Sequence, residues 1–151
     1  MTKNLDKDGL RSIADRYQLF YIDIWGVVHN GINVFENAII ALKEISRLKK
    51  EFVLLTNAPR PNINVMNFCE KLGMDKNLLN HVFTSGEAAL SYLKKNLSSK
   101  KFFHVGPPRD FDLFEGFKAY KTHKIDEASY ILCTGLYDEY KTDLNFYKDL
   151  L

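Results

Sequence analysis

The stretch LFYIDIWGVVHNG, residues 19–31, decides the fold of this chain. It opens with an apolar run that a single acid, Asp23, interrupts, and it then turns through Gly26 and Gly31. A short apolar run bounded by turn residues is typical of a buried strand in a parallel sheet. A carboxylate at the end of such a strand is costly unless a metal ion, backbone N–H groups or a lysine pairs with it. The stretch therefore predicts a fully buried strand that ends at a ligand-binding edge.

A second apolar run, residues 52–55, leads into Thr56-Asn57 shortly before Pro59. The apolar stripe of residues 37–49 predicts a helix between the two runs. A right-handed crossover would place the two strands side by side, with Asp23 and Thr56 at the same carboxyl edge. Taken singly, Asp23 also suits the cap of a loop, and Thr56-Asn57 also suits the start of a turn. The ordered pair is the more specific signal, because a carboxylate, a hydroxyl and an amide then meet at one edge.

The rest of the chain continues to alternate between helix and strand, which predicts an α/β fold with parallel sheets and helices on their faces. Ligands bind such sheets beyond the carboxyl ends of the strands. We expect further helices over residues 10–17, 65–72, 85–97 and from 142 onward, and further strands over 81–84, 101–105 and 129–133. The residues that follow the strands, and so become candidates for binding, are Asp23, Thr56-Asn57, Thr84-Ser85-Gly86, Gly106 and Thr134-Gly135.

The composition narrows the class of protein. The chain has 151 residues, of which 46% are hydrophobic and 26% charged, and its net charge is +2. These values exclude bulk disorder and a chain that coats nucleic acid by charge alone. Residues 1–17 contain acids and no apolar run typical of a signal peptide, and no window reaches 18 apolar residues. With only two cysteines, the sequence predicts a cytoplasmic protein with no membrane and no nucleic-acid partner.

At these motifs the sequence resembles the haloacid dehalogenase-like superfamily of phosphatases. YIDIWGVVHNG, residues 21–31, is similar to the first motif of that superfamily, and LLTNAPRP, residues 54–61, is similar to the second. The resemblance is to the branch with a large α/β cap inserted after the second motif, which includes nitrophenyl-phosphate and nucleotide phosphatases. Within that branch, the Asp-x-Trp-Gly-Val form resembles an uncharacterised subfamily. FTSGEAA, residues 83–89, and Cys133-Thr134-Gly135 also match its spacing.

The resemblance implies a role for each matching residue. Asp23 would be the nucleophile and a Mg²⁺ ligand, and Trp25 would offer its backbone carbonyl to the metal. Thr56, helped by Asn57, would hold the transferring phosphoryl group. An active protein would then need Mg²⁺ and would take a small phosphorylated metabolite as substrate.

Two departures from the family pattern matter. Phosphatases of the superfamily usually carry an acid two residues after the nucleophile, where this chain has Trp25, and loss of a general acid costs about 10²–10⁴-fold in rate. His29 is an alternative proton donor, although a loop histidine bonded to backbone fits the same position. The third and fourth motifs, which supply a lysine and further metal-binding acids, are absent. The resemblance therefore assigns residues 1–82 to the N-terminal half of a Rossmann-like core and residues 83–151 to the first part of a truncated cap.

Three functions remain open on the sequence. The first is a Mg²⁺-dependent phosphate monoester hydrolase, or an N-terminal fragment of one that is inactive alone. The second is a non-catalytic remnant or split-gene half that binds its complementary C-terminal chain, or a homo-oligomer. The third is a phospho-acceptor receiver module, which the Thr-Asn-Ala-Pro run of residues 56–59 disfavours. The substrate is left open, because cap residues select it in this branch.

Overall fold

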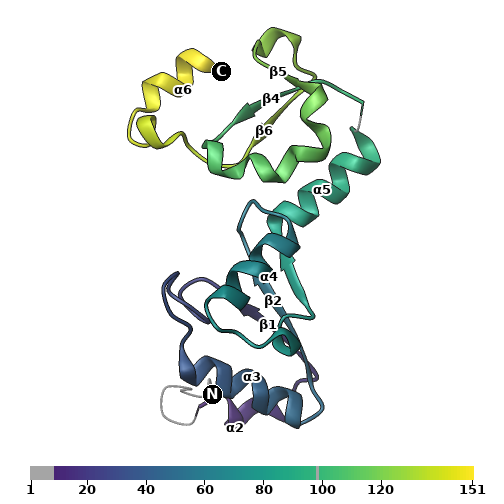
Figure 1. Ribbon diagram of the computed structural model, residues 1–151, viewed down its shortest axis with the longest axis vertical. Helices are drawn as coiled ribbons and strands as arrows, with labels where there is room; N and C mark the ends of the chain where they lie inside the picture. The colour runs from purple at the N-terminus through teal and green to yellow at the C-terminus, as the bar shows by residue number, and fades with distance from the viewer. Residues whose placement is uncertain (1–8, 98) are drawn as a thin grey trace. The chain divides into compact units, whose positions relative to one another are not determined.

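The computed structural model describes residues 9–97 and 99–151. The chain divides into two compact units, each with its own three-stranded sheet (Figure 1). Unit 1 comprises Met1–Asn57 and Asn62–Thr84, and unit 2 comprises Ala58–Pro61 and Ser85–Leu151. Within the described ranges, no helix has the length and apolar character needed to cross a membrane. The expectation about a signal peptide rests partly on residues 1–8, which lie outside the described residues.

Unit 1 is a parallel sheet in the order β1-β2-β3, with helices in the connections. Its strands are β1 (Leu19–Asp23), β2 (Glu51–Thr56) and β3 (Val82–Thr84), and its helices are α2 (Arg11–Ala14), α3 (Glu36–Arg47), α4 (Asn62–Lys71) and the 3₁₀ turn η1 (Lys76–Leu78). Both crossovers run in the same direction across the sheet, because β1, β2 and β3 are neighbours in sequence order. Right-handed crossovers then place α3 and α4 on the same face.

The other face of this sheet is bare in the described part of the chain. Leu54 on β2 points to the helical face and is 0% exposed, whereas its neighbour Leu55 is 41% exposed. Tyr21 on β1 is 69% exposed, and Leu19 and Phe83 are exposed as well. The prediction of a fully buried first strand is therefore wrong. The apolar run does form strand β1, but the described residues cover only one face of the sheet. Among the described strands, β1 also pairs only with β2.

Unit 2 is a second parallel sheet, in the order β5-β4-β6. Its elements are α5 (Ser85–Asn96), β4 (Phe102–Val105), η2 (Pro108–Tyr120), β5 (Lys121–Thr122), η3 (Ile125–Glu127), β6 (Tyr130–Cys133), η4 (Asp138–Tyr140) and α6 (Leu144–Leu150). The fully buried Phe102 on β4 lies at the centre of its core, where it packs edge-on against Phe114 and stacks on Tyr130. Leu90 and Leu93 of α5 complete the cluster.

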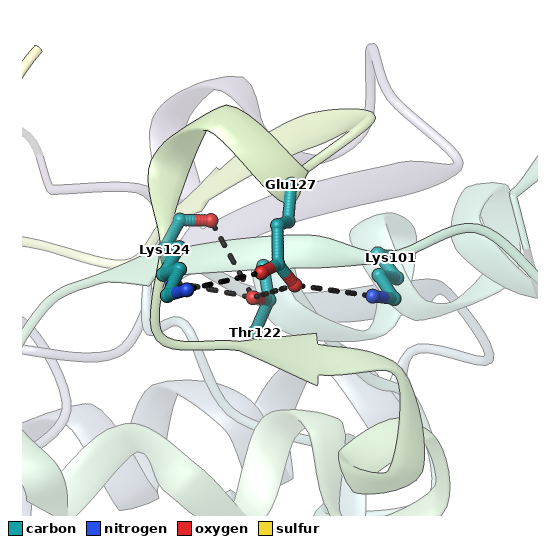
Figure 2. Close-up of polar contacts among 4 residues, drawn as sticks. All are labelled: Lys101, Thr122, Lys124 and Glu127. Atoms are coloured by element: carbon teal, nitrogen blue, oxygen red, sulfur yellow. Dashed lines mark hydrogen bonds and ion pairs between the residues drawn. The ribbon is translucent and has the colours of Figure 1, made fainter.

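A polar network closes the amino edge of this second sheet. Figure 2 shows the Glu127 carboxylate between the amino groups of Lys101 and Lys124, with the Thr122 hydroxyl beside it. Lys101 Nζ donates to Glu127 at 3.1 Å, and Thr122 Oγ1 donates to the same oxygen at 3.3 Å. The hydrogen bond from Lys101 lowers the pKa of Glu127. The network thus ties the start of β4 to β5 and η3 through one ionised carboxylate.

The α/β class with parallel sheets is confirmed, as are the strands expected after residues 50, 80, 100 and 128. The helical prediction over residues 10–17 is too long, since α2 ends at Ala14, and the last helix begins at Leu144 rather than near residue 142. The 3₁₀ segment η2 and the short strand β5 were not predicted, because residues 108–122 have no clear helical or alternating period. The sequence predicted a division after residue 82, whereas unit 1 ends at Thr84.

Leu54 and Leu55 lie on opposite faces of β2, so replacing each by alanine should lower the free energy of unfolding by different amounts. Leu54→Ala removes a fully buried side chain and should lower the free energy of unfolding by about 3–5 kcal/mol. Leu55→Ala, on the bare face, should cost less than about 1 kcal/mol. Urea denaturation of both variants measures the difference, and similar costs for the two would mean that something covers the Leu55 face.

Candidate active site

The carboxyl edge of the first sheet brings together the two residues that the motifs single out. Asp23 ends β1 and pairs in register with Leu55, the residue before Thr56, which ends β2. Thr56 in turn pairs with Thr84 at the end of β3. The prediction that Asp23 and Thr56 lie at the same edge of neighbouring strands is confirmed. Their chemical roles are not tested by this geometry and stay predictions.

The Asp23 carboxylate is exposed and oriented by its own backbone neighbour. The backbone N–H of Ile24 donates to Asp23 Oδ1 at 2.8 Å. Ile24 itself is buried, so the donor is held in place by the core. One carboxylate oxygen is therefore fixed against the backbone, and the side chain as a whole is open to solvent and to a ligand.

The loop after β1 is a tight turn built around a glycine. Gly26 adopts φ +77°, a conformation that favours glycine, and its N–H donates to the carbonyl of His29 at 2.8 Å. The N–H of Val28 donates to the carbonyl of Ile24 at 2.8 Å. Among the described residues, no backbone N–H donates to the carbonyl of Trp25. That carbonyl is therefore available to a metal ion, as the resemblance implies.

The Trp25 indole packs against a second glycine and a buried histidine. A Cβ at Gly31 would lie 2.6 Å from the Trp25 ring, so the ring rests directly on the glycine backbone. His29 is 3% exposed, and its ring meets Trp25 and Phe68 edge-on, each at 5.5 Å between centroids. Trp25 is nonetheless 62% exposed, so one side of the indole packs on Gly31 and His29 while much of the ring faces solvent, where phosphatases of the superfamily usually have an acid.

His29 is a poor substitute for the missing acid. Its Nδ1 accepts a hydrogen bond from the N–H of Gly31 at 2.9 Å, which leaves the proton on Nε2. Burial lowers the pKa of His29, so the ring is neutral at pH 7. The alternative role of His29 as a proton donor is therefore disfavoured, and the backbone-bonded loop histidine is what the structure contains.

Two further polar residues belong to this edge. Thr56 is buried and Asn57 is exposed, so the hydroxyl sits inside the edge and the amide at its surface. Thr84, at the end of β3, is also buried, and its backbone N–H donates to Asn62 Oδ1 at 2.9 Å. Thr84 was among the strand-end candidates, whereas the part that Asn62 plays in holding the edge has no signal in the sequence.

The described residues fit a Mg²⁺ ion only in part. Asp23 supplies one carboxylate and Trp25 one carbonyl oxygen, both of the hard oxygen type that Mg²⁺ prefers. Within the part of the chain that the structure describes, no group of three or more His, Cys, Asp or Glu side chains could hold a metal. Mg²⁺ keeps several waters in many sites, so this pair can begin a site but leaves the ion mostly hydrated.

The contact between Trp25 and Gly31 predicts a specific cost for a methyl group. Gly31 has φ +88°, so Gly31→Ala adds a left-handed backbone penalty of about 1–2 kcal/mol and also pushes on the indole. Gly26→Ala carries the backbone penalty alone, because nothing lies near its would-be Cβ. Trp25 is the only tryptophan, so its fluorescence reports the change. Gly31→Ala should be the less stable variant and should shift the emission, and identical behaviour of the two would contradict the packing described.

Comparison with solved structures finds close relatives of this fold. A haloacid dehalogenase-like hydrolase from Brucella suis is 31% identical and superposes with a TM-score of 0.78, covering 99% of this chain and 54% of its own. A 4-nitrophenylphosphatase from Thermotoga maritima is 19% identical with a TM-score of 0.62, over 80% of this chain and 46% of its own. A glycerol phosphate phosphatase from Mycobacterium tuberculosis, solved in complex with magnesium, is 19% identical and has a TM-score of 0.59. The match covers 82% of this chain and 38% of that phosphatase.

The chain thus spans about half the length of the first of these proteins. No curated protein matches it. The family model for haloacid dehalogenase-like hydrolases matches residues 20–119, which include the first two motifs and most of both units. The resemblance predicted from Asp23, Thr56 and their surroundings is confirmed, and the chain belongs to the haloacid dehalogenase-like hydrolase family.

Proposed function

We propose that this chain carries the nucleophile and the phosphate-binding edge of a phosphate monoester hydrolase. The observation that supports this most directly is the placement of the exposed Asp23 carboxylate beside Thr56 at one carboxyl edge. A carboxylate can act as a nucleophile in such chemistry, and a hydroxyl and an amide are good donors to phosphoryl oxygens. The substrate would be a small phosphorylated metabolite, and the compartment the cytoplasm. Two free cysteines, one of them exposed, support a reducing compartment.

Each residue at this edge has its own role in the proposed reaction. An Asp23 oxygen attacks phosphorus, the new O–P bond forms and the ester O–P bond breaks. The leaving oxygen takes its proton from solvent water, because Trp25 cannot supply one. Water then hydrolyses the acyl phosphate and restores the carboxylate. The N–H of Ile24 holds Oδ1 during this step, while Thr56 and Asn57 donate to the phosphoryl oxygens. Mg²⁺, held by Asp23 and the Trp25 carbonyl, would supply positive charge that neutralises the phosphoryl group.

We propose the same division of the chain that the motifs imply. Unit 1 would be the first half of the catalytic core, and unit 2, through residue 151, the front part of an inserted cap. The separate sheets of the two units and the half-length match to related structures support this assignment.

The lone chain should therefore hydrolyse p-nitrophenyl phosphate barely faster than buffer containing Mg²⁺. Trp25 cannot protonate the leaving oxygen, which costs about 10²–10⁴-fold, and the partial metal site adds to that loss. The measurement is release of nitrophenol with and without Mg²⁺, with Asp23→Asn as the control for contaminating phosphatase. Robust turnover by the lone chain that disappears in Asp23→Asn would contradict this account.

A second candidate function, binding to a complementary polypeptide, is favoured by the bare face of the first sheet. Tyr21, Leu55 and Phe83 are exposed apolar residues there, and β1 is an edge strand among the strands that the structure describes. A parallel sheet is normally covered on both faces, and an open strand edge is a template for another strand. We propose that the occupant is the half of the fold that this chain lacks, which would add a strand at β1 and helices on the bare face.

Complementation tests this binding function. The probe is the C-terminal part of the Brucella suis hydrolase that this chain does not match, mixed with this chain and examined by sedimentation. A 1:1 complex is expected, and Leu55→Glu should abolish it, whereas Ile40→Glu, an exposed isoleucine on α3, should not. In the complex, Mg²⁺-dependent turnover should appear and should be lost in Asp23→Asn. A dimer of this chain that Leu55→Glu disrupts, with no complex, would instead identify a second copy as the occupant.

A further inference from the structure

The carboxyl edge of the second sheet has the topology of a ligand crevice. β4 and β6 are parallel neighbours, and Val105 pairs with Cys133 at their ends. The strand order changes direction at β4, because β5 lies on one side of it and β6 on the other. The segments that follow β4 and β6 meet beyond the strand ends, where Arg109 binds Asp138. In open α/β sheets, such a switch point is where ligands bind. Gly106-Pro107 and Thr134-Gly135, two of the strand-end candidates, lie there.

A pocket of about 430 Å³ occupies this place, within the size range of small-molecule sites. The polar and charged residues of its lining are Arg109, Asp110, Thr134 and Lys141. The lining also includes Pro59 of the second motif, which the division of the chain assigns to unit 2. We call it the β4–β6 pocket.

The floor of the β4–β6 pocket is rigid. His104 Nε2 and Thr134 Oγ1 are hydrogen-bonded at 2.9 Å, and a Cβ at Gly106 would lie 2.1 Å from the same hydroxyl. Burial, together with the nearby Lys121, lowers the pKa of His104 to about 4, so the ring is neutral at pH 7. The Thr134 hydroxyl is thus fixed between an uncharged ring and the Gly106 backbone, which preorganises one wall for a ligand.

Two cations at the pocket share one carboxylate. Arg109 Nη1 and Lys141 Nζ both bind Asp138, the lysine at 2.7 Å. Arg109 is itself positioned through its carbonyl, which accepts a hydrogen bond from Arg60 Nη2 at 2.9 Å. Two positive charges against one negative charge leave one unit of positive charge at this side of the pocket. That excess suits a single anionic group, such as a carboxylate.

Asp110 contributes the opposite charge. It lines the pocket and is only 6% exposed. Among the described residues, none donates a hydrogen bond to its carboxylate or forms an ion pair with it. Its oxygens are not sealed from solvent, because Asp112 Oδ1 is the buried side-chain atom without a hydrogen bond among the described residues. An ammonium group in the pocket would supply this carboxylate with both a countercharge and three donors. A hydroxyl would supply a donor but no charge.

We propose that the β4–β6 pocket binds a small zwitterion of the amino acid type, with its ammonium group at Asp110 and its carboxylate at Arg109 and Lys141. The one negative and one net positive charge of the lining match the two charges of such a ligand. The volume exceeds that of the ligand backbone, so a side chain can be accommodated beside Pro107 and Leu136. The charged residues that carry this binding function differ from those of the Asp23 edge.

The test is a titration of the full chain with each of the common α-amino acids, followed by calorimetry or NMR. Acetate and methylammonium serve as probes that carry one charge each. At least one amino acid should bind with a Kd at least about tenfold below that of either single-charge probe. Binding of no amino acid more tightly than acetate would overturn the proposal.

Charge-matched variants locate the site. Asp110→Asn should weaken binding about tenfold or more and Lys141→Gln several-fold. Asp126→Asn and Lys148→Gln, exposed residues of the same unit away from the pocket, should bind like the parent chain. Asp23→Asn should also bind normally, so failure of the proposed hydrolase would not affect this result. Unchanged binding in both pocket variants would overturn the proposal.

A stability measurement separates loss of the ligand site from loss of the fold. Since the Asp110 carboxylate lacks a partner, Asp110→Asn should have a Tm equal to or above that of the parent chain. Lys141 is exposed, so its variant tests binding in a chain that keeps its fold. A marked fall in Tm for Asp110→Asn would assign this carboxylate a structural role and overturn its role as the ammonium ligand.

Discussion

The parallel pairing of β1 with β2 is the constraint on which the candidate active site depends. Its register sets Asp23 beside Leu55, and the next residue of β2 is Thr56. A shift of one residue would turn every side chain of β1 to the opposite face. It would move Asp23 and bury Tyr21 in place of Ile22. The buried Leu54 and the helices above it hold this register, so core packing and site geometry have the same origin.

The same sheet explains why the candidate active site and an exposed apolar surface occur in one unit. Both helical crossovers of unit 1 lie on one face, which leaves Leu55 and Phe83 exposed on the other. The candidate nucleophile Asp23 and the candidate phosphate-binding Thr56 lie at this edge, and Trp25 stands where phosphatases of the superfamily usually have an acid. The proposed function accounts for both features with one complementary polypeptide, because this chain spans about half the length of the Brucella suis hydrolase.

Much of this arrangement could be predicted from the sequence, and the gaps have physical causes. Asp23 and Thr56 were identifiable because each ends an apolar run, and parallel strands bring such ends together. The exposure of Tyr21 could not be predicted, because an apolar pattern does not show which face of a strand another segment covers. Asp110 was missed because it lies in a 3₁₀ segment without a regular period. The packing of His29 between Trp25 and Phe68 depends on α4, a contact that local sequence does not report.

The most direct test of the account is binding of beryllofluoride, which mimics a phosphoryl group on an aspartate, followed by ¹⁹F NMR in the presence of Mg²⁺. The account predicts a bound signal for the chain together with its complementary half, a weaker signal in Thr56→Val and none in Asp23→Asn. A bound signal of equal strength that persists in Asp23→Asn would show that the phosphoryl group is held elsewhere, and would contradict the assignment of this edge as the active site.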